Sequence, residues 1–119
     1  MGERVGSSVI LRVTPVSYTH LDVYKRQHWD RIIDINIRGV IHGVHAVYPG
    51  MVARGSGHII NTASVAGLAP APLLVPYATT KHAVVGLSIS LRAEAAAYGV
   101  KVSVLCPSAI ETPILDRCV

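Results

Sequence analysis

Two long segments of this chain repeat apolar residues at helical spacing, and two short segments have the composition of strands. One apolar stripe runs from His28 to about Tyr48, and a second runs from Pro76 to Tyr98. The run His58–Thr62 is rich in β-branched residues, and Val100–Cys106 alternates apolar positions. The pattern therefore predicts helix, strand, helix, strand, and Pro49-Gly50 is expected to end or kink the first helix.

A long helix between two strands forms a βαβ unit, in which the strands are parallel and the crossover is right-handed. The predicted fold class is α/β. Ser64 follows the carboxyl end of the first strand, and residues 107–112 follow that of the second. Tyr77 and Lys81 belong to the first turns of the connecting helix, at the same edge of the sheet. Open α/β sheets bind their ligands at this edge.

The pair Tyr77 and Lys81 is the strongest chemical signal in the sequence. A spacing of four residues on a helix puts both side chains on one face, with Cβ atoms about 5–6 Å apart. An ammonium that close to a phenol favours the phenolate form. Pro76 suits the first helical position, so the tyrosine also lies near the positive end of the helix dipole. Tyr77 is therefore a candidate general acid/base.

Each candidate residue also has an ordinary structural interpretation. Tyr77 alone could pack on the helix surface, and Lys81 alone could be a solvated charge. Ser64 could satisfy loop backbone, and Asn36, an amide among apolar helical residues, could bond main chain. Only their combination favours a catalytic site.

Four pieces of the sequence, in order and at these spacings, resemble the catalytic half of a short-chain dehydrogenase/reductase between about Trp29 and Ile114. They are Asp34-Ile35-Asn36, Ile60-Asn61-Thr62-Ala63-Ser64, the Tyr77/Lys81 pair, and Pro107-Ser108-Ala109-Ile110-Glu111-Thr112. The resemblance implies a partial Rossmann-like, doubly wound parallel sheet. It also implies hydride transfer between NAD or NADP and the hydroxyl or carbonyl group of a small-molecule alcohol or ketone.

The same resemblance assigns roles to residues. Tyr77 would donate or accept the proton, and Ser64 would hold the substrate oxygen by a hydrogen bond. Lys81 would favour the phenolate and bond the nicotinamide ribose, so that both Tyr77 and Lys81 contact the cofactor. Asn36 would support a proton relay through water.

The loop after the second strand would complete the cofactor site. By the resemblance, backbone around Pro107 and Ile110, with the Thr112 hydroxyl, faces the nicotinamide amide and the phosphates. One residue departs from the family pattern, because Ser108 stands where the family usually has glycine. The parent protein of such a chain is expected to be a homodimer or homotetramer.

The sequence contains no glycine-rich turn between a strand and a helix, the feature that lets backbone approach a dinucleotide pyrophosphate. Residues 1–27 do not continue the family pattern and resemble a translated adapter, so we interpret them as non-native or disordered. Residues 28–119 are interpreted as a fragment of a Rossmann-like oxidoreductase domain. At 119 residues the chain is less than half of what the resemblance predicts, and we expect it to have little or no activity.

Composition narrows the alternatives. Half of the residues are hydrophobic and 15% are charged, which is typical of one globular core. No apolar run reaches about 18 residues, so no membrane span is expected. The net charge of +4 comes from scattered basic residues, which argues against nucleic-acid binding. Cys106 and Cys118 have neither disulfide-framework nor zinc spacing, which favours a cytoplasmic protein, and no metal site is predicted.

Two rival hypotheses remain. The chain could be a non-catalytic module that dimerises through its two long helices, since both carry ridges of small residues, namely Gly39, Gly43, Gly86, Ser90, Ala93 and Ala97. A serine hydrolase using Ser64 with Lys81 is the weaker rival, because no Gly-x-Ser-x-Gly elbow surrounds the serine. For the leading hypothesis, the small apolar residues of the segment Ala66–Val75 would line a pocket for an apolar substrate.

Overall fold

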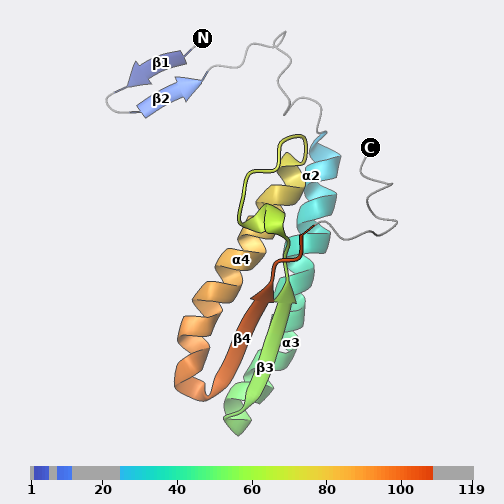
Figure 1. Ribbon diagram of the computed structural model, residues 1–119, viewed down its shortest axis with the longest axis vertical. Coiled ribbons are helices and arrows are strands. Elements are labelled where there is room, and N and C mark those ends of the chain that lie inside the picture. The colour runs from blue at the N-terminus through green and yellow to red at the C-terminus, as the bar shows by residue number, and fades with distance from the viewer. Residues whose placement is uncertain (1, 6–7, 12–24, 109–119) are drawn as a thin grey trace.

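The computed structural model describes residues 2–5, 8–11 and 25–108, and residues 25–108 follow the predicted order of helix, strand, helix, strand (Figure 1). Before them, the strands β1 (Gly2–Val5) and β2 (Ser8–Leu11) pair in antiparallel fashion. The remaining elements are α2 (Arg26–Ile33), the π-helix η1 (Asp34–Arg38), α3 (Gly39–Arg54), β3 (Gly57–Thr62), the 3₁₀ turn η2 (Val65–Gly67), α4 (Val75–Ala95), the 3₁₀ turn η3 (Ala96–Tyr98) and β4 (Val100–Leu105).

The strands β3 and β4 are parallel, and α4 is the crossover between them, as predicted. Their register runs from Gly57 opposite Val100 to Thr62 opposite Leu105. Both strands begin just after a helix that ends on a left-handed glycine, Gly55 at φ 70° and Gly99 at φ 72°. Glycine adopts this conformation without the Cβ clash that other residues suffer, so each helix can turn back sharply into its strand.

The first long helix extends further than the sequence predicted. Helical structure is continuous from Arg26 to Arg54, so Pro49 lies inside α3 and does not end it. Pro49 removes one backbone donor, but it is exposed, so water can satisfy the carbonyl left without a partner. Beyond the proline, Met51 and Val52 still pack on the sheet, which favours continuing the helix. The predicted stripe is confirmed, since each of its members is half-buried: Trp29, Ile33, Ile37, Val40, Val44 and Tyr48.

The core lies between the helices and one face of β3 and β4, in two clusters. The cluster near the start of the strands consists of Ile59, Ala95, Val100 and Val102, with Val44, Tyr48, Met51, Val52 and Leu91 against it. The cluster near their carboxyl ends consists of Ala63, Val84 and Val85, with Val40, Val104 and Cys106 against it. Alternate residues of each strand point into these clusters, as expected for a sheet with one covered face.

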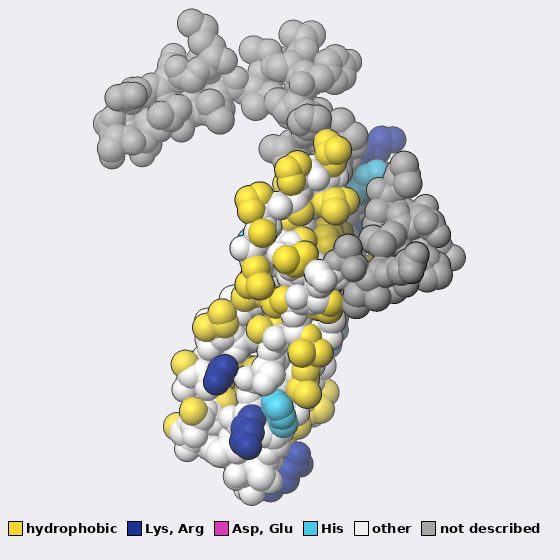
Figure 2. All heavy atoms as spheres, viewed as in Figure 1, with side chains coloured by type: hydrophobic (Ala, Val, Ile, Leu, Met, Phe, Trp, Pro, Cys, Tyr) yellow, Lys and Arg dark blue, Asp and Glu magenta, His cyan; other side chains and the backbone are white. Residues whose placement is uncertain are grey.

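The opposite face of the two strands is open. Ile60 is 56% exposed and Leu105 is 54% exposed, and His58 joins Ser103 across the strands at 2.9 Å. In Figure 2 hydrophobic side chains gather over the half of the molecule where the strands end, and basic side chains lie near where the strands begin and again at the top of the view. The carboxyl edge of the sheet is therefore the more apolar of the two edges on this face.

Candidate active site

The fold brings the predicted site segments to one edge of the sheet. Ser64 lies two residues beyond β3, and Pro107 lies two residues beyond β4. Tyr77 and Lys81 belong to the first two turns of α4, which starts at Val75 with Pro76 in its first turn, as predicted. The backbone geometry therefore places three separate segments around the carboxyl ends of the parallel strands, where α/β sheets bind ligands.

The Lys81 amine lies between the Tyr77 ring and the end of β3. Its Nζ atom is 5.5 Å from the centroid of the tyrosine ring and 3.5 Å from the carbonyl oxygen of Thr62, to which it donates a long hydrogen bond. The first distance is within the range of cation–π attraction, about 6 Å. The arrangement holds a positive charge beside a phenol at the mouth of the sheet, and both side chains remain partly accessible.

Ser64 is held by the short loop that follows β3. Its backbone is extended, and its Oγ atom accepts a hydrogen bond from the amide of Ala66 at 3.2 Å, which caps the turn η2. Among the described residues its hydroxyl has no bond to Tyr77, so the facing of serine and phenol stays a prediction. The oxygen acts as an acceptor here, and the hydroxyl hydrogen can still be donated to a bound group.

Gly67 fixes the position of this loop against α4. A Cβ atom at Gly67 would lie 2.7 Å from the carbonyl oxygen of Lys81 and 3.0 Å from Cγ2 of Val85. Only a residue without a side chain permits this approach of backbone to backbone. This role of Gly67 was not predictable, because the closeness of two segments fourteen positions apart leaves no local signal in the sequence.

A second backbone contact joins the two loops of the site. The amide of Val65 donates to the carbonyl of Pro107 at 2.9 Å, and the amide of Ala63 donates to the carbonyl of Leu105 at 2.7 Å. These bonds continue the ladder of β3 and β4 past the strand ends. Of the other residues predicted to bind cofactor, Ile110 and Thr112 lie outside the described residues.

Asn36 reaches the site through α4. It occupies the middle of the π-helical segment Asp34–Arg38, and its Nδ2 atom donates to Oγ1 of Thr80 at 3.0 Å. Thr80 in turn donates to the carbonyl oxygen of Tyr77 at 2.8 Å. π-Helical insertions are rare in proteins, and those that occur are often found at functional sites. Thr80 was not singled out from the sequence, although it is a polar residue one turn before Val84 on the apolar face of the helix.

The loop before α4 presents apolar side chains beside the site. Leu68 is 63% exposed, Leu73 is 66% exposed and Leu74 is 38% exposed. Leu73 has a φ of 67°, a conformation that is unusual for a bulky residue. The segment Ala66–Val75, expected to line the substrate pocket, thus includes several exposed apolar groups in the loop that leads into the helix of Tyr77.

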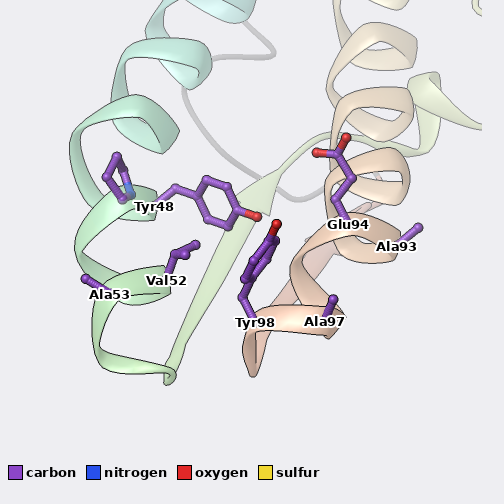
Figure 3. A pocket seen from close by; sticks show the side chains of 8 residues that line it. Tyr48, Val52, Ala53, Ala93, Glu94, Ala97 and Tyr98 are labelled. Carbon is purple, nitrogen blue, oxygen red and sulfur yellow. The ribbon is translucent and has the colours of Figure 1, made fainter.

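A hollow of about 750 Å³ lies at the opposite end of the helices and includes none of the predicted site residues. Figure 3 shows Tyr48 on α3 and Tyr98 on η3 pointing toward one another across it, with Glu94 above them. Its other lining residues are Pro49, Val52, Ala53, Ala93 and Ala97. The hollow is therefore separate from the candidate active site.

Within residues 2–5, 8–11 and 25–108, no three His, Cys, Asp or Glu side chains are grouped closely enough to hold a metal ion. In the same part of the chain, no helix combines the length and the apolar character that crossing a membrane requires.

A family model and a curated relative both match most of this chain. The family model for short chain dehydrogenases matches residues 15–118, a longer match than the sequence analysis anticipated. An oxidoreductase of Listeria innocua is 40% identical over 118 residues, which are 96% of this chain and 48% of that protein. The chain thus spans about half the length of this relative.

Two solved structures are similar to this chain in fold as well as in sequence. A gluconate 5-dehydrogenase of Burkholderia cenocepacia, in complex with NADP and tartrate, has a TM-score of 0.76 and 37% identity, over 79% of this chain and 37% of that one. A 3-oxoacyl-[acyl-carrier protein] reductase of Brucella melitensis with bound NAD has a TM-score of 0.72 and 35% identity, over 80% and 37%. These similarities confirm the predicted Rossmann-like α/β class. The chain belongs to the short-chain dehydrogenase family.

Proposed function

We propose that this chain is the catalytic part of an NAD(P)-dependent oxidoreductase that interconverts an alcohol and a ketone or aldehyde. The observation that carries the proposal is the Lys81 amine, which lies 5.5 Å from the Tyr77 ring at the carboxyl edge of two parallel strands. The ammonium lies beside the ring at the edge where α/β sheets bind ligands, so Tyr77 is placed to give a proton to a substrate oxygen or to take one from it.

In the direction of reduction, Tyr77 gives its phenolic proton to the carbonyl oxygen of the substrate, which becomes a hydroxyl. When bound, the reduced nicotinamide supplies the hydride that adds to the carbonyl carbon. Ser64 donates its hydroxyl hydrogen to the same substrate oxygen and so orients it. In oxidation the proton moves from the alcohol to the Tyr77 oxygen, with the positive charge of Lys81 beside the ring.

The nicotinamide end of the cofactor fits the residues that this chain provides. The Lys81 ammonium has three donors and spends one on Thr62, so others can reach a ribose hydroxyl. Pro107, Ile110 and Thr112 are proposed to continue the site along the loop after β4. The two solved neighbours hold NADP and NAD, which supports this cofactor class without deciding between its members.

The pyrophosphate is proposed to bind residues outside this sequence, which has no glycine-rich turn between a strand and a helix. We therefore propose that the 119 residues alone have little or no activity. A cytoplasmic location and an apolar substrate are part of the same proposal. The exposed Leu68, Leu73 and Leu74 beside the site support the choice of substrate class.

The test uses the complete gene product that contains these residues, assayed with a panel of secondary alcohols and both NAD⁺ and NADP⁺. Replacing Tyr77→Phe removes only the proton-transfer group, so kcat should fall roughly 100- to 10,000-fold. Tyr98→Phe is the matched control, since Tyr98 is exposed at the far end of the same helix layer, and it should leave kcat unchanged. Activity that survives Tyr77→Phe would refute the assigned mechanism.

A second candidate, self-association through the long helices, is favoured by their outer surfaces. A Cβ at Gly43 or Gly86 would meet nothing within 4 Å, so both glycines leave open space beside their helices. Large apolar side chains are exposed on the same helices, with Ile89 at 60% and Val47 at 43%. We propose that a second copy packs against these surfaces to give a homodimer or homotetramer.

Light scattering with Gly86→Leu tests this assembly. The leucine has room in the single chain and should raise helix propensity, so circular dichroism should show an intact fold. It would nevertheless keep a second helix from approaching closely. We expect the dimer to dissociate, and an unchanged oligomer would show that the ridge lies outside the contact.

A further inference from the structure

Thr80 is the most completely buried polar residue of the site region, with 0% of its surface exposed. Its hydroxyl both donates and accepts, because Oγ1 donates to the carbonyl of Tyr77 at 2.8 Å and accepts from the Asn36 amide at 3.0 Å. Asn36 and Thr80 are 44 positions apart in sequence. A buried hydroxyl with both partners satisfied joins these two elements at a defined distance and angle.

The carbonyl that Thr80 contacts belongs to the turn carrying the proposed acid/base. In an α-helix the carbonyl of Tyr77 also accepts the amide of Lys81, four residues on. One oxygen therefore receives bonds from Thr80 and from the backbone of Lys81. The link from Asn36 consequently ends on the backbone unit that holds both Tyr77 and Lys81.

We propose that Thr80 is a positioning residue, which holds the Asn36 amide and the first turns of α4 in the arrangement that proton transfer needs. This inference rests on the proposed oxidoreductase function and extends it to a residue that touches neither substrate nor cofactor. Without the hydroxyl, the part-buried Asn36 amide loses its acceptor, and the Tyr77 turn loses its tie to the π-helical segment. A displacement of about 1 Å at a reacting group can lower a rate up to roughly 100-fold.

The same helix provides a matched control two turns further on. Ser88, 2% exposed, accepts from the Asn61 amide at 3.0 Å and donates to the carbonyl of Val84 at 2.7 Å. The donor, the hydroxyl and the helical carbonyl are therefore of the same kinds as in the Asn36–Thr80 link. The difference is that this second link ends on Val84, in the core, rather than on Tyr77.

The experiment compares Thr80→Val, Thr80→Ser and Ser88→Ala with the unchanged complete gene product. Thr80→Val and Ser88→Ala should both lower the melting temperature. Only Thr80→Val should lower kcat, by about tenfold, with KM for the cofactor unchanged. Thr80→Ser keeps the hydroxyl and should restore kcat. If Thr80→Val does not fold, Thr80→Ala removes the hydroxyl without adding a second methyl group.

Three kinetic results would overturn the proposal. They are an unchanged kcat in a folded variant that lacks the hydroxyl, an equal loss of kcat in Ser88→Ala, or no recovery in Thr80→Ser. A readout independent of turnover separates this proposal from the proposed function. If the unchanged protein oxidises no alcohol, the proposed function is refuted. Side-chain NMR signals still test whether Thr80 links Asn36 to the Tyr77 turn.

In that measurement the signals are the Asn36 side-chain amide and the Tyr77 ring carbons. Both should shift in Thr80→Val and hold their positions in Ser88→Ala. The Asn61 side-chain amide signal should shift in Ser88→Ala and stay in place in Thr80→Val. If the Asn36 and Tyr77 signals do not shift when the Thr80 hydroxyl is removed, the positioning role is disproved.

Discussion

The two ends of the helix layer are organised differently. At the carboxyl edge, polar bonds join separate elements: Asn36 to Thr80, Lys81 to the end of β3, and the loop at Val65 to Pro107. At the amino edge, α3 and η3 end on the left-handed glycines Gly55 and Gly99, and a hollow opens between Tyr48 and Tyr98 (Figure 3).

The difference matters because hydrogen bonds fix direction, whereas apolar contacts mainly exclude water. Proton transfer requires side chains at set angles, so polar links are useful where Tyr77 and Lys81 lie. Turns that only reverse the chain need close backbone approach, which glycine permits. Substitutions at the two ends should therefore affect stability alike and affect catalysis unequally.

The largest effect is expected from Gly67→Ala at the carboxyl edge. The new methyl group would lie 2.7 Å from the Lys81 carbonyl oxygen, so the loop with Ser64 must move away from α4. Overpacking of this kind destabilises by about 3 kcal/mol, at the upper end of the usual range, because backbone meets backbone. Urea unfolding should show this loss, and kcat should fall as Ser64 moves away from Tyr77.

Gly50→Ala is the matched control for that substitution. A Cβ at Gly50 would meet only Nη1 of Arg54, at the ordinary contact distance of 3.9 Å, and alanine in a helix is favoured over glycine by about 1 kcal/mol. The control should be at least as stable as the unchanged protein and equally active. Equal behaviour of the two alanine variants would show that the loop does not depend on Gly67.

Gly99→Ala should destabilise the amino edge without affecting catalysis. Gly99 has a φ of 72°, where alanine is disfavoured by roughly 1–2 kcal/mol, and the added Cβ would crowd the carbonyl of Gly55. The free energy of unfolding should fall by about 2 kcal/mol. With the protein kept well below its melting temperature, kcat should match that of the unchanged enzyme. A fall in kcat as large as that in Gly67→Ala would remove the contrast between the ends.

Much of the fold was predictable because it depends on patterns along the chain. The half-buried stripe from Trp29 to Tyr48, the parallel pair β3 and β4, and the cap at Gly99 follow from spacing and residue type. The shared edge of Ser64, Tyr77 and Lys81 follows from the βαβ topology. Contacts between distant segments were not predictable, because nothing local to Gly67 or Thr80 indicates which backbone each one meets.

The prediction at Pro49 shows the same limit. The local rule predicted that the helix ends or kinks there, but α3 continues to Arg54, and Met51 and Val52 beyond the proline pack on the core. The segment 1–27 stays a prediction as non-native or disordered, and the family match that begins at residue 15 lies partly within it. For the helix around Pro49 and for the segment 1–27, local residue propensity is a weak guide to structure when the tertiary contacts are unknown.

The smallest effect is expected from Pro49→Ala, which probes the end of the helix layer beside the hollow. Alanine restores a backbone donor in the interior of α3, where proline is unfavourable by about 3 kcal/mol in model helices. Part of this gain is offset, because the unfolded chain regains freedom when proline is removed. Pro49 is also exposed, so water can already bond the carbonyl that its ring leaves without a partner.

A net increase of about 1 kcal/mol in the free energy of unfolding is therefore expected, measured by urea denaturation. The kcat should not change, since Pro49 is at the opposite end of the helices from Tyr77. A stabilised variant with altered turnover would indicate that strain at the amino edge is transmitted along α3 to Asn36. That result would show that the two ends of the helix layer are structurally coupled, because Asn36 and Pro49 belong to the same continuous helix.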